Sequence, residues 1–347
     1  MAVNLLLSTH VWTLPLNAYG VRQHVAALYE EVFRGCDVRV YPKRPTGNLL
    51  SDVLRHLPVL LGDEVNVLAP DYPVVAGALA TLVRRNPALI VHTWKVPGVS
   101  DERLSARVYD FMLRRVIDRA RSVVVVSMTQ KRQLEALGVS CTVLFVQVSV
   151  DSRFWHPDPV GMDDLLAHFG LEKRGYVLTV GGSDRDEAYA AHVAGMMGLP
   201  YVRATYNVHT AETARLQLAS ENLESHSRIL IKPSDVELRA LYAGAWLVCL
   251  PTQTRTNPAG LTSLVEAMAC GAAVAIPETI AERYVEDGTN GLVLRGAPDE
   301  FAARLLSKRD NLTMIGQRAR KFAEIELNNL TVAQRVRDQF RSERVWR

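Results

Sequence analysis

Residues 256–293 read TNPAGLTSLVEAMACGAAVAIPETIAERYVEDGTNGLV, and this stretch decides the fold class. Within it, apolar residues recur at helical spacings of three and four, at Leu261, Leu264, Val265 and Met268. The spacing predicts a helix that begins at Gly260 and ends at Gly271, because glycine readily adopts the left-handed conformation that terminates many helices. The apolar run 273–276 then predicts a buried strand, and Asn290-Gly291 predicts a tight turn.

The segment before this helix predicts an anion site. A short apolar run from Trp246 to Leu250 reads as a strand that ends at Pro251. The loop that follows therefore joins the carboxyl end of a strand to a helix N-terminus, which is where open α/β sheets bind ligands. The backbone amides of Leu261 and Thr262, together with the positive end of the helix dipole, suit a diphosphate without any metal.

The helix itself resembles a known signature. Glu266-Ala-Met-Ala-Cys-Gly271 is similar to the second half of the motif of the retaining glycosyltransferases of family 4, which have the GT-B fold. That motif is a Glu, seven residues, a second Glu and Ala-Met-Ala-x-Gly. The second Glu binds the ribose of a nucleotide sugar, so the resemblance implies this role for Glu266. In place of the first Glu stands Pro258, beside Asn257. We expect Asn257 or Thr256 to replace that Glu at the donor sugar.

Glu266 also has a structural interpretation. Ser263 and Glu266 form the Ser-x-x-Glu pattern of a capping box, in which the two side chains satisfy free amides at a helix start. The run from Glu282 to Gly291, at family-like spacing, favours the functional role.

Two segments of the N-terminal half resemble the same family. Tyr19-Gly-Val-Arg-Gln-His-Val25 is similar to the family's Gly-Gly-Val-x-x-His-Val loop, near which acceptor and transferred group meet, and it retains one glycine, Gly20. A turn with positive φ also accounts for Gly20. Ala88-Leu-Ile-Val-His-Thr-Trp94 resembles the strand that ends in a His facing the donor sugar, which implies this role for His92. A structural hydrogen bond is the alternative for His92.

The two cations that hold the donor diphosphate in this family are missing from their usual sequence positions. Family members carry Gly-Arg after the first strand of the second domain and a Lys about six residues on; here Gly182 and Ala188 stand near those positions. Arg185 lies three residues after the family's Arg position, at the sheet edge where ligands bind. Lys232 follows the predicted strand 228–231. We interpret Arg185, Gly182 and Lys232 as donor-binding candidates. Solvated or Asp-paired surface residues are the alternative for both cations.

Three rival functions start from other features. Asp184-x-Asp186 resembles the metal-binding pair of the GT-A glycosyltransferases, but we interpret it as turn and helix-capping residues, so no metal is expected. A nicotinamide oxidoreductase would need a Gly-x-Gly-x-x-Gly fingerprint after a strand, and none is present. A non-catalytic protein that binds nucleotide sugars stays open, because the first Glu and the usual Arg/Lys pair are absent.

Composition limits the function classes further. The chain has 347 residues, 48% of them hydrophobic, and a net charge of +3, which indicates a globular protein rather than one that binds nucleic acid. It lacks an apolar run long enough to span a membrane and a signal peptide, and its four cysteines are scattered, so we expect a cytoplasmic protein. The Arg-rich run 103–121 reads as an amphipathic helix, with apolar residues at Leu104, Val108, Phe111, Met112 and Val116. A membrane-surface role for this helix is the less favoured alternative.

Short apolar runs alternate with helical patterns throughout and predict parallel sheets. We predict an α/β protein with two Rossmann-like doubly wound domains facing across a cleft, of GT-B type. Residues 1–157 would form an acceptor-binding domain and 158–328 a nucleotide-sugar-binding domain, with a helix in 329–347 packing back on the first. Val150 to Pro157 resembles the family's hinge segment, and Pro157-Asp-Pro159 reads as an extended connector.

The resemblance implies a metal-independent hexosyltransferase or related enzyme. It would move a sugar from a nucleoside-diphosphate sugar to an acceptor hydroxyl with retention of anomeric configuration. No cofactor is expected beyond this donor. The absence of an evident hydrophobic docking helix favours a soluble small-molecule acceptor over a lipid-linked or cell-envelope glycan, with peripheral membrane contact left open.

Overall fold

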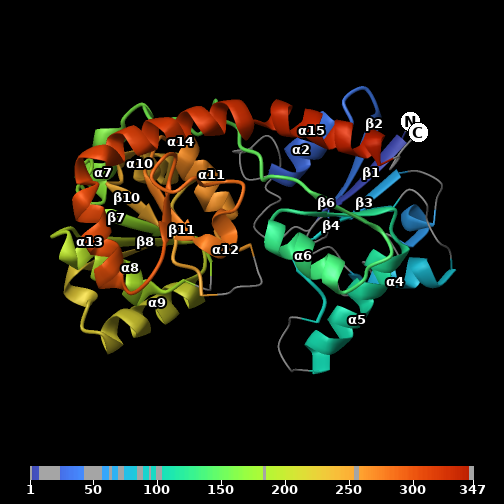
Figure 1. Ribbon diagram of the computed structural model, residues 1–347, viewed down its shortest axis with the longest axis horizontal. Coiled ribbons are helices and arrows are strands. Elements are labelled where there is room, and N and C mark those ends of the chain that lie inside the picture. Colours follow the sequence, from blue (N-terminus) through green and yellow to red (C-terminus); the bar gives the residue numbers. More distant parts are fainter. Residues whose placement is uncertain are drawn as a thin grey trace. The chain divides into compact units, whose positions relative to one another are not determined.

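The chain folds into two compact α/β units, shown in Figure 1 as a computed structural model. The structure describes residues 2–7, 24–42, 57–61, 65–68, 74–83, 89–93, 95–98, 104–182, 185–253 and 258–343. Unit 1 comprises Met1–Ser149, Thr256–Pro258 and Asn329–Arg347; unit 2 comprises Val150–Arg255 and Ala259–Asn328. Each unit holds one six-stranded parallel sheet with helices packed on it, so the predicted pair of Rossmann-like domains is confirmed.

Unit 1 has strand order β2-β1-β3-β4-β5-β6. Its elements in chain order are β1 (Ala2–Leu7), α2 (His24–Val32), β2 (Asp37–Pro42), β3 (Val65–Leu68), α4 (Val74–Val83), β4 (Leu89–His92), α5 (Leu104–Arg119), β5 (Ser122–Val125), α6 (Met128–Ala136), β6 (Thr142–Phe145) and α15 (Asn329–Ser342). One apolar core lies between the sheet and the helices α2 and α15, where Val336 and Phe340 of α15 are buried. A second core includes Leu113, Val116 and Ile117 of α5.

Unit 2 has strand order β12-β11-β10-β7-β8-β9. Its elements are α7 (Met162–His168), β7 (Val177–Val180), α8 (Glu187–Met196), β8 (Tyr201–Thr205), α9 (Val208–Ser220), β9 (Ser227–Ile231), α10 (Asp235–Gly244), β10 (Leu247–Cys249), α11 (Leu261–Ala269), β11 (Val274–Pro277), α12 (Glu278–Ala281), β12 (Leu292–Leu294), α13 (Pro298–Ser307) and α14 (Leu312–Glu326). Strands β7, β8 and β10 are buried along their whole length, as their apolar sequences predict.

Helix α11 has the limits that its sequence predicts. Gly260 precedes it with φ of 100°, and Gly271 follows its end with φ of 73°, both in the left-handed region that favours glycine. The capping-box interpretation of Ser263 is wrong, because Ser263 lies inside the helix and no side chain caps Gly260. Among the residues that the structure describes, the amides at the start of α11 therefore receive no side-chain cap.

The segment from Val150 to Pro157, which resembles the family's hinge, packs within unit 2. Trp155 is completely buried, and its ring meets that of Tyr242 edge-on at 5.8 Å. Arg320 of α14 donates to the backbone oxygens of Trp155 and Ser152, at 2.5 and 3.0 Å. The chain divides at Val150 rather than after Pro157, because this aromatic anchor ties the segment to α10 and α14.

Candidate donor-binding site

The predicted site lies where the strand order of unit 2 reverses. From β7 the chain proceeds to β8 and β9 on one side, and from β10 to β11 and β12 on the other. The loops that leave β7 and β10 therefore diverge, which is the place where open α/β sheets bind ligands. These loops are joined by an isolated bridge between Arg185 and Thr252 and by a 2.8 Å hydrogen bond from the Asp186 amide to Pro251 O.

Arg185 lies at the N-terminus of α11. Its side chain is 5% exposed, and its Nε and Nη2 donate to the Val180 carbonyl at 3.3 and 3.2 Å. A Cβ atom placed on Gly260 would stand 3.5 Å from Nη2, and one placed on Gly181 would stand 2.6 Å from it. Both glycines thus leave space that the guanidinium occupies, directly beside the helix start.

The donors around this helix start suit an anion. The amides of Leu261 and Thr262 belong to the first turn of α11, whose macrodipole places positive potential there. The buried hydroxyls of Thr252 and Thr262 have no hydrogen-bond partner among the described residues. The structure therefore brings together Arg185, Gly260, Leu261 and Thr262, four of the residues singled out from the sequence.

A buried ionic network supports the turn after β7, and the sequence analysis missed it. Arg203 of β8 is fully buried, and its Nε pairs with Glu187 Oε1 at 2.7 Å. Its Nη2 donates to the carbonyls of Gly181 and Gly182 at 3.1 and 2.8 Å. Tyr201 also donates to Glu187, and burial followed by this carboxylate raises the pKa of Tyr201 well above its usual range. The sequence feature that could have revealed this network is Arg203, a charged residue inside the otherwise apolar segment 201–205.

Gly182 therefore contributes through its backbone. Its carbonyl accepts from Arg203, and no atom of the described residues lies within 4 Å of the place where a Cβ would stand. The open space above Gly182 and the tight space at Gly181 distinguish two adjacent glycines that the sequence alone presents as equivalent.

Glu266 faces the interior of unit 2. It is 3% exposed and accepts a 3.1 Å hydrogen bond from the Tyr242 hydroxyl of α10. Burial, and then the charge of Glu266, raises the pKa of the Cys270 thiol well above its ordinary value. The carboxylate thus lies between α10 and α11, one and a half turns into the helix whose start lies beside Arg185.

His92 belongs to unit 1, at the carboxyl end of β4. Its side chain is 2% exposed and meets the Tyr29 ring edge-on at 5.8 Å. Neither ring nitrogen has a hydrogen-bond partner in the described part of the chain. Burial lowers the pKa of His92 to about 3, so the imidazole is neutral at pH 7 and could exchange hydrogen bonds with a sugar hydroxyl without carrying charge.

This burial predicts an acid-sensitive fold. The pKa of His92 is lower in the folded state than the ordinary 6.5, so the unfolded chain binds the proton first. The contribution to stability is complete above pH 6.5 and falls by roughly 1 kcal/mol per pH unit between pH 6.5 and 3. We expect His92→Leu to flatten the fall in urea stability between pH 7 and 5. His209→Gln, at an exposed position, should keep the wild-type slope, and an unchanged slope in His92→Leu would contradict the assignment.

Of the remaining candidates, Lys232 belongs to the described residues. Lys232 is exposed after β9, two strands away from β7, and its amide donates to Thr205 O at 2.7 Å. Gly20, Thr256 and Asn257 lie outside the described residues.

The alternative metal site is not supported at its described residue. Asp186 caps α8 by accepting from the Tyr189 amide at 2.9 Å, as the capping interpretation predicts, while Asp184 lies outside the described residues. Within the described ranges no three His, Cys, Asp or Glu side chains are placed to hold a metal ion.

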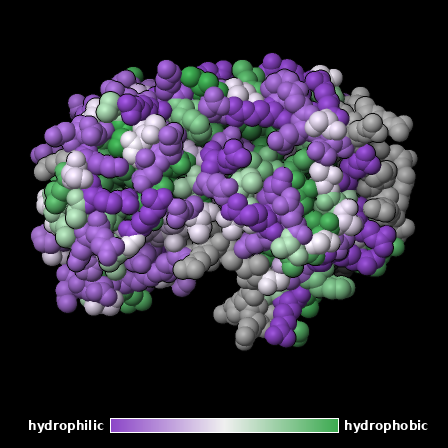
Figure 2. All heavy atoms as spheres, in the orientation of Figure 1, coloured by the Kyte–Doolittle hydropathy of each residue, from purple (hydrophilic) through white to green (hydrophobic). Residues whose placement is uncertain are grey.

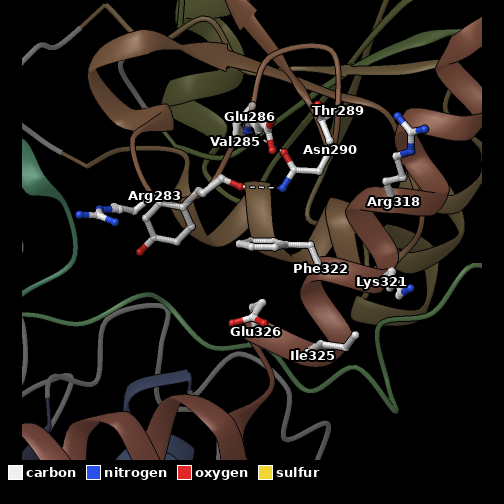
Figure 3. Close-up of a pocket in the computed structure, with 11 residues that line it drawn as sticks. Arg283, Val285, Glu286, Thr289, Asn290, Arg318, Lys321, Phe322, Ile325 and Glu326 are labelled. Carbon is white, nitrogen blue, oxygen red and sulfur yellow. Dashed lines mark hydrogen bonds between the residues drawn. The ribbon is translucent and has the colours of Figure 1, made fainter.

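A separate cavity of about 430 Å³ lies beside α14 (Figure 3). It is lined by Arg283, Tyr284, Val285, Glu286, Thr289, Asn290, Arg318, Lys321, Phe322, Ile325 and Glu326. Asn290 shapes one wall, because it donates to Tyr284 O at 3.2 Å and accepts from the Glu286 amide at 2.7 Å. None of the candidate donor-binding residues lines this cavity.

Solved structures share the architecture. HepE of Anabaena, in complex with UDP and glucose, matches with a TM-score of 0.76 at 17% identity, covering 99% of this chain and 100% of that chain. Sucrose-phosphate synthase of Thermosynechococcus elongatus matches with a TM-score of 0.73 at 15% identity, covering 98% of both chains. A glycosyltransferase of Rickettsia africae matches with a TM-score of 0.67 at 12% identity, covering 99% of this chain and 98% of that chain. At such identities the likeness establishes the fold, which is the GT-B fold.

A family model also matches part of unit 2. Residues 202–311 match the family model described as glycosyl transferases group 1. No curated protein matches the chain. The match falls on the part of unit 2 that contains α11, and it bears out the resemblance to the group 1 glycosyltransferases of family 4, which the shared GT-B fold also supports.

Proposed function

We propose that the protein transfers a sugar from a nucleoside-diphosphate sugar to an acceptor hydroxyl with retention of anomeric configuration. The observation that carries this proposal is the position of Arg185 beside the uncapped start of α11, at the sheet position where the strand order reverses. A guanidinium, free amides and a helix dipole together favour a diphosphate.

The chemistry places its main demand on this anion site. A nucleoside diphosphate leaves with added negative charge while the sugar becomes oxocarbenium-like. Donors that are already in place when this charge develops stabilise the transition state, at a few kcal/mol for each contact. Arg185 and the amides of Leu261 and Thr262 would act here, and no metal ion is required. Transfer should therefore survive chelation of divalent cations, and a strict manganese requirement would contradict this mechanism.

Two further roles complete the proposal. Glu266 would hold the ribose by charge-assisted hydrogen bonds, which requires the nucleotide to reach the carboxylate beside Tyr242. The neutral imidazole of His92 would contact the donor sugar, and Asn257 or Thr256 would replace the missing Glu of the family motif. Lys232 is a second-rank candidate for the diphosphate, because its side chain is exposed beyond β9.

The proposed function has two forms, which differ in the class of acceptor. The sequence favours a soluble small-molecule acceptor, and a lipid-linked or envelope glycan is the alternative. The surface of α5, described below, favours the alternative.

A nucleotide screen tests the donor class. Thermal unfolding would be followed with UDP, GDP, dTDP and their sugars, beginning with UDP and UDP-glucose, because the HepE structures hold UDP and glucose or UDP-glucose. A ligand at 100 times its dissociation constant should add about 2.7 kcal/mol of stability. Stabilisation by NADH alone would favour an oxidoreductase instead. Binding of a nucleotide sugar without turnover on any acceptor would favour the non-catalytic alternative.

Glu266→Gln tests the ribose contact at nearly constant side-chain volume. Loss of a hydrogen bond to a charged group costs about 1.5–3 kcal/mol, so donor affinity should fall by roughly tenfold or more. Tyr242→Phe removes only the partner hydroxyl and is the matched control, with donor affinity close to wild type. Isothermal titration calorimetry on variants with verified folding would give both values. Equal affinities for wild type and Glu266→Gln would leave Glu266 with a structural role alone.

A further inference from the structure

Helix α5 exposes three large apolar side chains on one face. The exposed fractions are 77% for Leu104, 48% for Val108 and 70% for Phe111. Their spacings of four and three place them in one stripe along the first two turns. The sequence suggested that they share the apolar side of the helix with Val116, which is wrong. The buried face is instead formed by Leu113, Val116 and Ile117.

Beyond this stripe, the C-terminal half of α5 carries several arginines. The acidic residues of α5 are engaged, since Asp118 pairs with Arg114 at 2.7 Å and Asp110 accepts from the Gly98 amide at 2.9 Å. Arg107, Arg115 and Arg119 form no ion pair with any residue that the structure describes. The last two turns therefore carry excess positive charge next to Phe111.

An open groove of about 680 Å³ joins the two features. It is lined by Phe111, Arg114, Arg115, Asp118, Arg119, Gly138 and Ser140. The lining contains three arginines and one aspartate. The Nε atom of Arg115 is buried without a hydrogen-bond partner among the described residues. The groove thus offers guanidinium donors to an anion that lies immediately beside an exposed aromatic ring.

Apolar residues that continue into a basic groove match a lipid surface. Helices that lie in the membrane interface bury an apolar face and attract anionic headgroups through Lys and Arg. Figure 1 shows α5 projecting from the sheet of unit 1, and Figure 2 shows hydrophobic and hydrophilic side chains side by side where it lies. None of the helices within the described ranges is long and apolar enough to cross a membrane.

We propose that α5 docks unit 1 on an anionic lipid bilayer. Leu104, Val108 and Phe111 enter the interface, while Arg115 and Arg119 hold headgroup phosphates in the groove. The consequence for function is that the acceptor hydroxyl is presented at a lipid surface. Docking itself needs no nucleotide sugar, so its test is independent of the proposed transferase activity.

The test is co-sedimentation of the full chain with phosphatidylcholine vesicles, with and without phosphatidylglycerol. The wild type should sediment with the anionic vesicles only, and added salt should release it. Phe111→Ser should weaken binding about tenfold through lost apolar burial, and Arg119→Glu by at least about fivefold through lost attraction.

Matched controls change exposed positions of unit 2. Leu306→Ser, at a side chain that is 53% exposed, and Lys173→Glu, at an exposed lysine, should bind as the wild type does. Absence of binding to anionic vesicles, or equal losses in the controls, would overturn the proposal. A dimer seen by light scattering that Phe111→Ser dissociates, without vesicle binding, would also overturn it and identify a second copy as the occupant.

Discussion

Arg185→Ala is expected to raise the dissociation constant of the nucleoside diphosphate by about tenfold to a hundredfold. A hydrogen bond to a charged group contributes about 1.5–3 kcal/mol, and each 1.4 kcal/mol corresponds to a factor of ten. The effect should be large because the guanidinium lies beside the uncapped start of α11, in a position where water screens its charge poorly. Calorimetric titration with the nucleotide that responds in the thermal screen measures it.

Two variants make this result specific. Arg185→Lys keeps the charge but loses the planar fork, so we expect an intermediate affinity. Lys232→Ala removes an exposed cation after β9 and should change the affinity by less than about threefold. A full loss in Lys232→Ala with none in Arg185→Ala would transfer the diphosphate role to Lys232.

Arg203→Ala should have the largest effect on stability, lowering the free energy of unfolding by about 3–5 kcal/mol. The substitution leaves the Glu187 carboxylate buried without its cation, and the carbonyls of Gly181 and Gly182 lose their donor. Urea unfolding at pH 7 measures the loss. Because this network holds the turn beside Arg185, we also expect weaker nucleotide binding in the fraction that remains folded.

An exposed ion pair supplies the comparison. Arg215 and Glu212 pair at 2.9 Å with both side chains more than half exposed, so Arg215→Ala should cost less than about 1 kcal/mol. The double variant Arg203→Met, Glu187→Gln should lose less stability than the sum of its single changes, since neither charge is left alone. An Arg203→Ala loss as small as that of Arg215→Ala would show that water reaches Glu187.

The elements of the fold follow from local patterns. The predicted strand from Trp246 to Leu250 contains β10 (Leu247–Cys249), and α11 begins and ends at its two glycines, because hydrophobic period and glycine conformation act within a few residues. The placement of Arg185 at the sheet edge was likewise predictable, since parallel strands bring their carboxyl ends to one edge. Its catalytic role, and that of Glu266, stay predictions.

Long-range packing decided the rest. The direction in which Glu266 points depends on Tyr242, and the support of the glycine turn depends on Arg203, residues that lie more than twenty positions away in the chain. Which face of α5 is buried depends on α4 and the sheet, so the pattern of Leu104 and Phe111 alone was misleading. Sequence periodicity specifies a helix or strand and its apolar positions, whereas burial and hydrogen-bond partners are set by elements that meet only after the chain has folded.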